Sequence, residues 1–188
     1  MNTILESNPI IVGLNWGAIL EDGWFNSKLH VGIDLDLCCF LIDNSQNLKD
    51  IISLENPNSI FGELSKDDME GDMDGNDQRD NEWLIIDLNK INTDFELHIS
   101  ISNYSEKSLK KISHLDYRIY SGKPNQVIKR FYFKDLKKIE LNNTTKGIYL
   151  GKIKNNDGVW SFNNSEIQLE VCEPTQQIEQ ILSHQPIK

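Results

Sequence analysis

Cysteine is scarce in this sequence, and its spacing excludes two kinds of structure. Cys38 and Cys39 are adjacent, and the third cysteine, Cys172, lies far along the chain. Such spacing provides neither a disulfide framework nor a Cys-x-x-Cys zinc motif. The sequence therefore predicts buried free thiols in a reducing compartment, which favours a cytoplasmic protein.

Long hydrophobic runs and clustered positive charge are missing as well. No apolar run approaches the ~20 residues that a membrane-spanning helix needs, and no leader-like segment opens the chain. The 19 Lys and Arg residues are outnumbered by 29 Asp and Glu residues, for a net charge of −10, and they form no basic stripe along the sequence. This balance argues against nucleic-acid binding, because phosphate backbones are held by clustered Lys and Arg. An anionic membrane would also be repelled, unless a bound cation intervened.

The sequence does contain many short segments in which apolar and polar residues alternate. In the clearest one, Phe95, Leu97, Ile99 and Ile101 share one face, and such alternation is typical of a half-buried strand. Similar segments cover residues 8–16, 32–43, 83–88, 115–121, 127–133, 147–154 and 159–162. Many short strands with no long helical period between them predict an all-β fold, an antiparallel β-sandwich.

Helix is expected in two short places only. One is residues 106–112. The other is the C-terminal tail, where Thr175 is expected to cap a helix that carries Ile178, Ile181 and Leu182 on one side.

Turn chemistry and composition also suggest how the chain is divided. The Asp157-Gly158 pair is typical of a tight hairpin turn, because glycine accepts a positive φ. We interpret residues 1–173 as one β-sandwich domain and residues 174–188 as a tail.

An acidic segment, "DDMEGDMDGNDQRDNE" at residues 67–82, stands out from this pattern. On composition alone, this segment fits a solvated loop as well as it fits a cation-binding loop. The strand before it favours a cation site, because alternation places Asp34 and Asp36 on one face, roughly 7 Å apart, with no Lys or Arg within four residues. Either this end of the strand reaches solvent, or a cation binds there.

The acidic segment has the chemistry of a hard-cation site. Calcium takes six to eight oxygen ligands from carboxylates, amides and carbonyls. The segment offers glycines as turn points and a set of oxygen donors: Asp72, Asp74, Asp77, Asp80, Asn81 and Glu82. Transition metals are disfavoured because the four histidines are scattered. An EF-hand is excluded, because the flanking segments are strand-like and the glutamate falls one position late.

Five stretches, in order, give the chain a family resemblance. They are "GLNWG" at 13–17, "DLDLCCFLID" at 34–43, "GDMDGNDQRDNEWLIIDLNKI" at 71–91, "LHISISN" at 97–103 and "GIYLGKIKNNDGVWSF" at 147–162. Together they resemble the TerD family of bacterial tellurium-resistance and stress-response proteins. The resemblance implies a β-sandwich that binds calcium through its Asp-Leu-Asp strand and acidic loop, with no established enzymatic activity. The residues that match those family positions are Asp34, Asp36, Asp72, Asp80, Asn81 and Glu82.

The chain departs from the family pattern at several positions. Gly17 follows the early tryptophan where the family has aspartate, so a ligand is missing there unless Asn15 or Asp22 substitutes. Gln78 and Arg79 stand where the family has Asp-Gly. An inward-pointing arginine would weaken cation binding.

These observations predict a calcium-binding sensor or scaffold with a protein partner, and no catalyst. Two alternatives stay open: a calcium-dependent membrane module like a C2 domain, and a metal-free protein-interaction domain. Calcium binding would also raise stability, because a ligand that binds only the folded state shifts the folding equilibrium.

Overall fold

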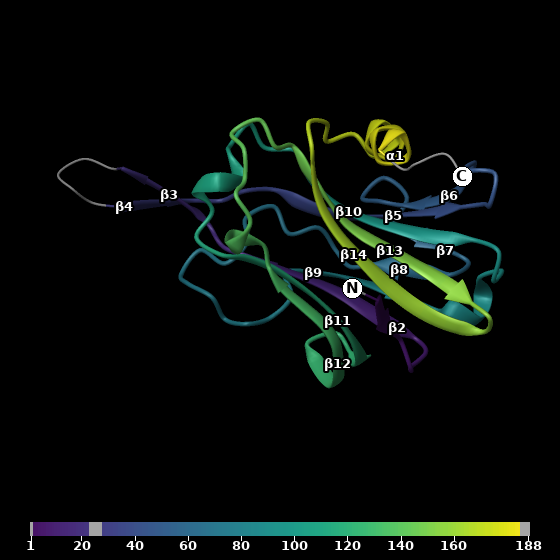
Figure 1. Cartoon of the computed structure of the whole chain (residues 1–188). Helices are drawn as coiled ribbons and strands as arrows, with labels where there is room; N and C mark the ends of the chain where they lie inside the picture. The colour runs from purple at the N-terminus through teal and green to yellow at the C-terminus, as the bar shows by residue number, and fades with distance from the viewer. Residues whose placement is uncertain (1, 23–27, 185–188) are drawn as a thin grey trace.

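A computed structural model of the chain describes residues 2–22 and 28–184. Two six-stranded sheets face each other, and a two-stranded hairpin projects from one end of the molecule (Figure 1). Sheet 1 has the order β1 (Asn2–Ile4), β14 (Val159–Leu169), β13 (Gly147–Asn156), β10 (Glu96–Asn103), β5 (Leu35–Ile42) and β6 (Leu48–Ile52). Sheet 2 has the order β12 (Gln126–Asp135), β11 (Leu115–Lys123), β2 (Ile10–Trp16), β9 (Glu82–Ile86), β8 (Gly62–Leu64) and β7 (Asn58–Ser59). The hairpin consists of β3 (Ile19–Asp22) and β4 (Lys28–Val31).

The predicted antiparallel β-sandwich is confirmed. All strand pairs within the two sheets are antiparallel. Strand β5 shows why the sequence folds this way: Leu35, Leu37 and Cys39 enter the core between the sheets, while Cys38 and Phe40 lie on the outer face of sheet 1. The predicted assignment of residues to the two faces of this strand is correct.

The outer face of sheet 1 is covered by the only α-helix in the described part of the chain, α1 (Pro174–Ser183). Ile178 and Ile181 pack on Phe40 and its neighbours. Gln177 is fully buried, accepts a hydrogen bond from the Ser100 hydroxyl at 2.5 Å and donates to the Ile101 carbonyl. The polar side of β10 is therefore buried under a helix.

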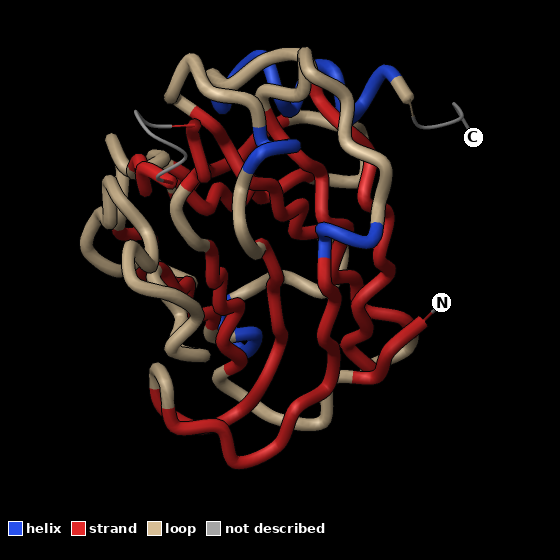
Figure 2. Tube along the Cα trace, turned by 90° about the vertical axis from the view of Figure 1, so that its left-hand side faces the viewer, coloured by secondary structure: helices blue, strands red, loops and turns tan. Residues whose placement is uncertain are grey.

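The predicted C-terminal helix is confirmed, but its cap and the other helix prediction require correction. Helix α1 begins at Pro174 after Glu173, because proline fits the first helical position, where no amide donor is needed; Thr175 lies inside the helix. The segment predicted at 106–112 is only a 3-10 turn, η3 (Leu109–Lys111), capped by Ser108. Two further 3-10 turns are η2 (Leu88–Lys90) and η4 (Leu136–Lys138). Figure 2 shows these short helical pieces confined to the connections between strands.

The predicted tight turn joins β13 to β14. Asp157 and Gly158 both have positive φ, 52° and 86°, and Asn156 pairs with Val159. Two positive φ values match the twist of the flanking strands, which is why Asp-Gly is favoured there. In the described part of the chain, no helix is both long and apolar enough to cross a membrane.

Candidate metal centre

Four carboxylates meet beside an unpaired stretch of β5. Strand β5 pairs with β6 only from Cys39 to Ile42, so its first residues lack a partner strand on that side. Glu82, the first residue of β9 in sheet 2, reaches this edge and accepts a hydrogen bond from the Leu37 amide at 3.0 Å. Asp34 directly precedes β5, Asp36 lies on β5, and Asp67 lies in the loop after β8.

Three of the carboxylates form a compact group that runs from the interior to the surface, and Glu82 lies next to this group. Ligand oxygens of Asp34, Asp36 and Asp67 all lie within 4.8 Å of one another. Asp36 is 0% exposed, Asp34 is half-buried and Asp67 is exposed. We name Asp34, Asp36, Asp67 and Glu82 the carboxylate cluster.

Several oxygens of the carboxylate cluster have no hydrogen-bond donor among the described residues. They are Asp34 Oδ1, both carboxylate oxygens of Asp36, and Glu82 Oε1, and all four are buried. Buried polar atoms in native proteins are nearly always paired, and leaving one unpaired costs about 1–3 kcal/mol. Four such acceptors in one place indicate that something positive belongs between them.

Electrostatics in the cluster support this conclusion. Burial raises the pKa of Asp36 to about 7, and the carboxylates of Asp34 and Asp67 add to the effect. Burial also raises the pKa of Glu82 to about 9, despite the hydrogen bond from Leu37, and Asp36 contributes repulsion. No described Lys or Arg forms an ion pair with any of the four carboxylates. Without a cation, Asp36 and Glu82 therefore tend to hold protons.

The donor set fits a hard divalent cation. Every group in the carboxylate cluster offers oxygen, and four carboxylates supply up to eight oxygen atoms, the ligand type and number that calcium takes. The group of converging ligands contains no histidine or cysteine, which disfavours zinc and copper.

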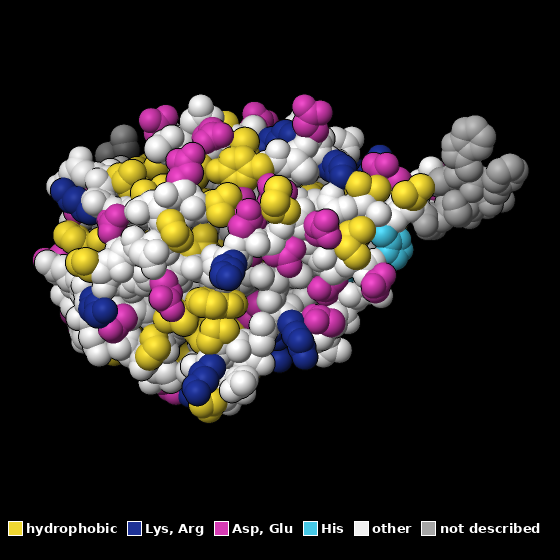
Figure 3. Space-filling model, turned by 180° about the vertical axis from the view of Figure 1, so that it is seen from behind, with side chains coloured by type: hydrophobic (Ala, Val, Ile, Leu, Met, Phe, Trp, Pro, Cys, Tyr) yellow, Lys and Arg dark blue, Asp and Glu magenta, His cyan; other side chains and the backbone are white. Residues whose placement is uncertain are grey.

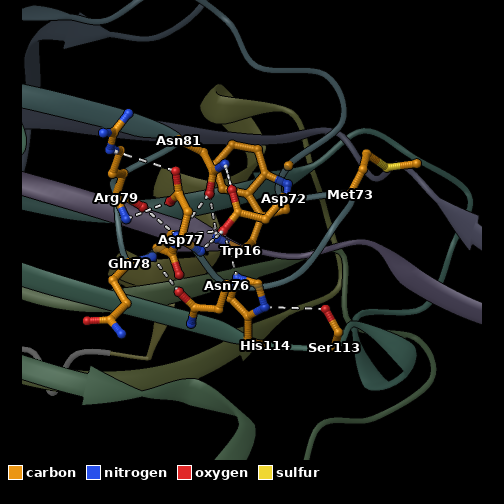
Figure 4. A network of polar contacts seen from close by, with 12 residues as sticks. Trp16, Asp72, Met73, Asn76, Asp77, Gln78, Arg79, Asn81, Ser113 and His114 are labelled. Carbon is orange, nitrogen blue, oxygen red and sulfur yellow. Dashed lines mark hydrogen bonds and ion pairs between the residues drawn. The ribbon is translucent and has the colours of Figure 1, made fainter.

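Asp72, by contrast, is held by protein donors. Figure 4 shows its carboxylate surrounded by polar side chains. Asn81 Nδ2 donates to Asp72 Oδ1 at 3.0 Å, while Asn15 Nδ2 lies 3.3 Å and His114 Nε2 3.4 Å from Oδ2. Backbone bonds to Trp16 and Ala18 fasten the same residue to the end of β2. Asn15, considered as a substitute ligand, therefore supports Asp72 and does not join the carboxylate cluster.

Asp80 anchors the acidic loop to the outer face of sheet 2. Its carboxylate receives hydrogen bonds from Arg118 Nε at 2.7 Å and the Tyr120 hydroxyl at 2.6 Å. It lies directly over Gly13, where a Cβ would overlap the carboxylate. Because its two oxygens are occupied by these donors, Asp80 acts as an anchor.

The remaining predicted ligands lie outside the group of converging carboxylates. Asp74 and Asp77 are exposed, and Asp77 accepts a hydrogen bond from the Arg79 amide at 2.8 Å. Arg79 is itself exposed and directed toward Asp77, so it does not enter the carboxylate cluster. Asn81 accepts a bond from the Trp16 amide at 2.7 Å.

Of the predicted set, the structure thus brings together Asp34 and Asp36, with Glu82 next to them. It adds Asp67, which the sequence analysis placed in the acidic segment but not among the ligands. The adjacent Asp68 accounts for the position of Asp67, since its side chain accepts bonds from the Glu70 and Gly71 amides and so turns the chain there. The adjacent Asp67 and Asp68 at the start of the acidic segment are the sequence feature that could have indicated this additional ligand.

Comparison with known proteins places this arrangement in a family. No curated protein matched the chain. The family model described as the TerD domain matches residues 3–168 of the 188, which includes the whole carboxylate cluster and both sheets except the last residue of β14 and the first of β1. The chain therefore belongs to the TerD family.

Proposed function

We propose that the protein binds one calcium ion through Asp34, Asp36, Asp67 and Glu82. The observation that carries this proposal is the set of buried, unpaired carboxylate oxygens of Asp34, Asp36 and Glu82. A divalent cation would satisfy these acceptors and neutralise the repulsion that adds to burial in raising their pKa values.

A second ion is not expected at the acidic loop. Around Asp72, the amides of Asn15 and Asn81 and the ring of His114 already occupy the space beside the carboxylate. At Asp80, Arg118 provides the positive charge. We therefore propose a stoichiometry of one.

We infer a role as a sensor or scaffold in a bacterial stress response that resembles tellurite resistance, without catalysis. Tellurite is an oxyanion, and a chain of net charge −10 repels it, so direct capture is disfavoured. Calcium would instead join the start of β5, the loop after β8 and the start of β9 into one ordered surface for a protein partner. The three free cysteines suit a reducing compartment, so we place the protein in the cytoplasm.

A second candidate function is calcium-dependent membrane binding. Met69, at the edge of the acidic loop, is 64% exposed, and Leu20 and Leu29 are exposed on the projecting hairpin. His30 of that hairpin contacts the Met73 carbonyl, which ties the hairpin to the loop. C2-type modules use exposed apolar side chains beside bound calcium, and these three residues supply the same chemistry.

Titration calorimetry of the metal-free protein with calcium tests the main proposal. We expect saturable binding with a stoichiometry near one, abolished in Asp36→Asn and retained in Asp74→Asn, the matched loop control. Absence of binding up to millimolar calcium in the folded wild-type protein would instead support a metal-free interaction domain. Sedimentation with phosphatidylserine vesicles, with calcium or a chelator, tests the membrane alternative, which requires cosedimentation only with calcium.

A further inference from the structure

Positive charge is concentrated in one segment of this acidic chain. Residues 110–138 contain nine of the 19 Lys and Arg residues and only two of the 29 Asp and Glu residues, so the segment carries +7 while the chain carries −10. The sequence analysis found no basic stripe, because the charges are spread along the segment. The fold gathers them, since β11 and β12 form a hairpin at one edge of sheet 2 with η3 and η4 beside it.

Strand β12 is an open edge. It pairs with β11 on one side, and no strand in residues 2–22 or 28–184 pairs with its other side. It is ten residues long, and its first five residues are exposed. An edge strand of this length presents unpaired amide and carbonyl groups, which can template pairing with another chain.

Exposed apolar side chains lie among the cations of this edge. Ile128 is 84% exposed, and Val127 and Phe133 are exposed as well. In Figure 3, the lower part of the face, where β11 and β12 lie in Figure 1, shows Lys and Arg side chains next to apolar ones. The Arg130 guanidinium lies 5.4 Å from the centre of the Phe133 ring.

Most of these cations are available to a partner. Arg118 is committed to Asp80, and Lys134 pairs with Glu166. Lys129 pairs with Glu6 only at the exposed surface, where such pairs contribute little. Lys138 likewise pairs with Asp135 only at the exposed surface. Within the described residues, no ion pair involves the other five cations: Lys110, Lys111, Lys123, Arg130 and Lys137.

We propose that the open edge of β12 binds an acidic, extended segment of a partner protein by strand addition. The backbone of β12 supplies the ladder of hydrogen bonds, and Ile128 and Phe133 supply apolar contacts. Arg130 on β12, together with Lys123 at the adjoining end of β11, favours a partner strand rich in Asp or Glu. Strand addition is an established mode of peptide recognition in which main-chain bonds give affinity and side chains give specificity.

Charge excludes the other occupants of such an edge. Two copies pairing through β12 would bring like charges opposite one another, which destabilises strand pairing. A long polyanion such as nucleic acid or a membrane would extend beyond this edge toward the rest of the chain, which is strongly negative. Phe131 and Tyr132 also pack against the core and so cannot stack on bases. By contrast, an acidic peptide segment of about ten residues is short enough to contact only the positive edge.

Fluorescence anisotropy with a labelled ten-residue peptide, in which Glu alternates with Thr and Val, tests the proposal on the full-length protein. We expect saturable binding that weakens at least about tenfold in Lys123→Glu/Arg130→Glu and is unchanged in Lys90→Glu, an exposed charge reversal outside this edge. Far-UV circular dichroism confirms that the variants fold. The same peptide with alternate backbone amides methylated keeps its charge but loses half its strand donors, and we expect it to bind at least about tenfold more weakly.

Three outcomes would overturn the proposal. They are no binding of the acidic peptide, equal binding of the methylated peptide, and tighter binding of single-stranded dT10 or phosphatidylserine vesicles than of the peptide. The binding edge contains no residue of the carboxylate cluster, so peptide binding should persist in a calcium chelator and in Asp36→Asn. Failure of calcium binding therefore leaves this test intact.

Discussion

Glu82 Oε2 accepts a hydrogen bond from the Leu37 amide at 3.0 Å, and this contact joins the two sheets at the carboxylate cluster. Glu82 belongs to sheet 2, whereas Leu37 lies on the unpaired stretch of β5 in sheet 1. One carboxylate oxygen thus pairs the Leu37 amide of β5, while the other is buried without a hydrogen-bond partner. The same side chain has a structural task and a proposed ligand task.

Substitution of Glu82 should separate those two tasks. Glu82→Gln keeps a carbonyl oxygen for the Leu37 amide, and we expect the metal-free melting temperature near pH 7 to be no lower than that of wild type, because a neutral amide removes the cost of burying this carboxyl group. Glu82→Ala leaves the amide unpaired, and we expect a loss of about 1–3 kcal/mol. Both variants should lose most of the calcium-induced rise in melting temperature, which scanning calorimetry with calcium and with a chelator measures. A full calcium response in Glu82→Gln would contradict the ligand assignment.

Stability of the metal-free protein should depend on pH in an unusual direction. The pKa of Asp36, about 7, and that of Glu82, about 9, lie above ordinary carboxyl values because of burial. The native state therefore binds more protons than the unfolded state, and its stability falls as pH rises from 7 to 9. Urea unfolding in chelator across this range measures the slope, and Asp36→Asn/Glu82→Gln should flatten it.

Calcium should reverse that dependence. A cation binds the ionised carboxylates, so calcium affinity should rise over the same pH range as protons are displaced. Calorimetric titrations near pH 7 in buffers with different ionisation enthalpies count the protons released. No proton release would show that Asp36 and Glu82 are not titrating ligands.

Substitution of Asp80 tests whether this residue anchors the acidic loop or binds calcium. Asp80→Ala leaves Arg118 without its buried partner, and we expect a loss of about 3–5 kcal/mol with calcium stoichiometry unchanged. Gly13→Ala should also destabilise the protein, because its Cβ would overlap the Asp80 carboxylate. Urea unfolding and calcium titration measure the two quantities separately. Loss of calcium binding in a folded Asp80 variant would restore Asp80 to the ligand set.

Helix α1 should be held to sheet 1 mainly by Gln177 and its apolar neighbours. Gln177→Ala leaves the Ser100 hydroxyl and the Ile101 carbonyl without their partner, and we expect a cost of about 1–3 kcal/mol. Glu179→Ala, on the exposed side of the helix, serves as the control. Thermal melts compare the two, and equal melting temperatures would show that the packing of Ile178 and Ile181 alone holds the helix.

Local patterns in the sequence were sufficient to predict much of the fold. Alternation placed Asp34 and Asp36 on one face of their strand, because side chains of a strand alternate whatever it pairs with. The Asp157-Gly158 pair identified its turn, since few residues adopt two successive positive φ values at low cost. The error at Thr175 concerns a helix end, where proline fixes the first helical residue. The helix expected at residues 106–112 is only a 3-10 turn, because weak local helix preference is overridden by tertiary context.

The candidate site depended more on tertiary structure. By itself, the sequence determined that Asp34 and Asp36 share a strand face without a nearby cation and that an acidic segment follows. Only the tertiary structure decided that Asp67 and Glu82 join them, that Asp80 turns to Arg118, and that scattered Lys and Arg residues meet along β12. The physical reason is range: periodicity and turn preferences act within a few residues, whereas a metal site or a binding edge requires approach between segments that are distant in the chain.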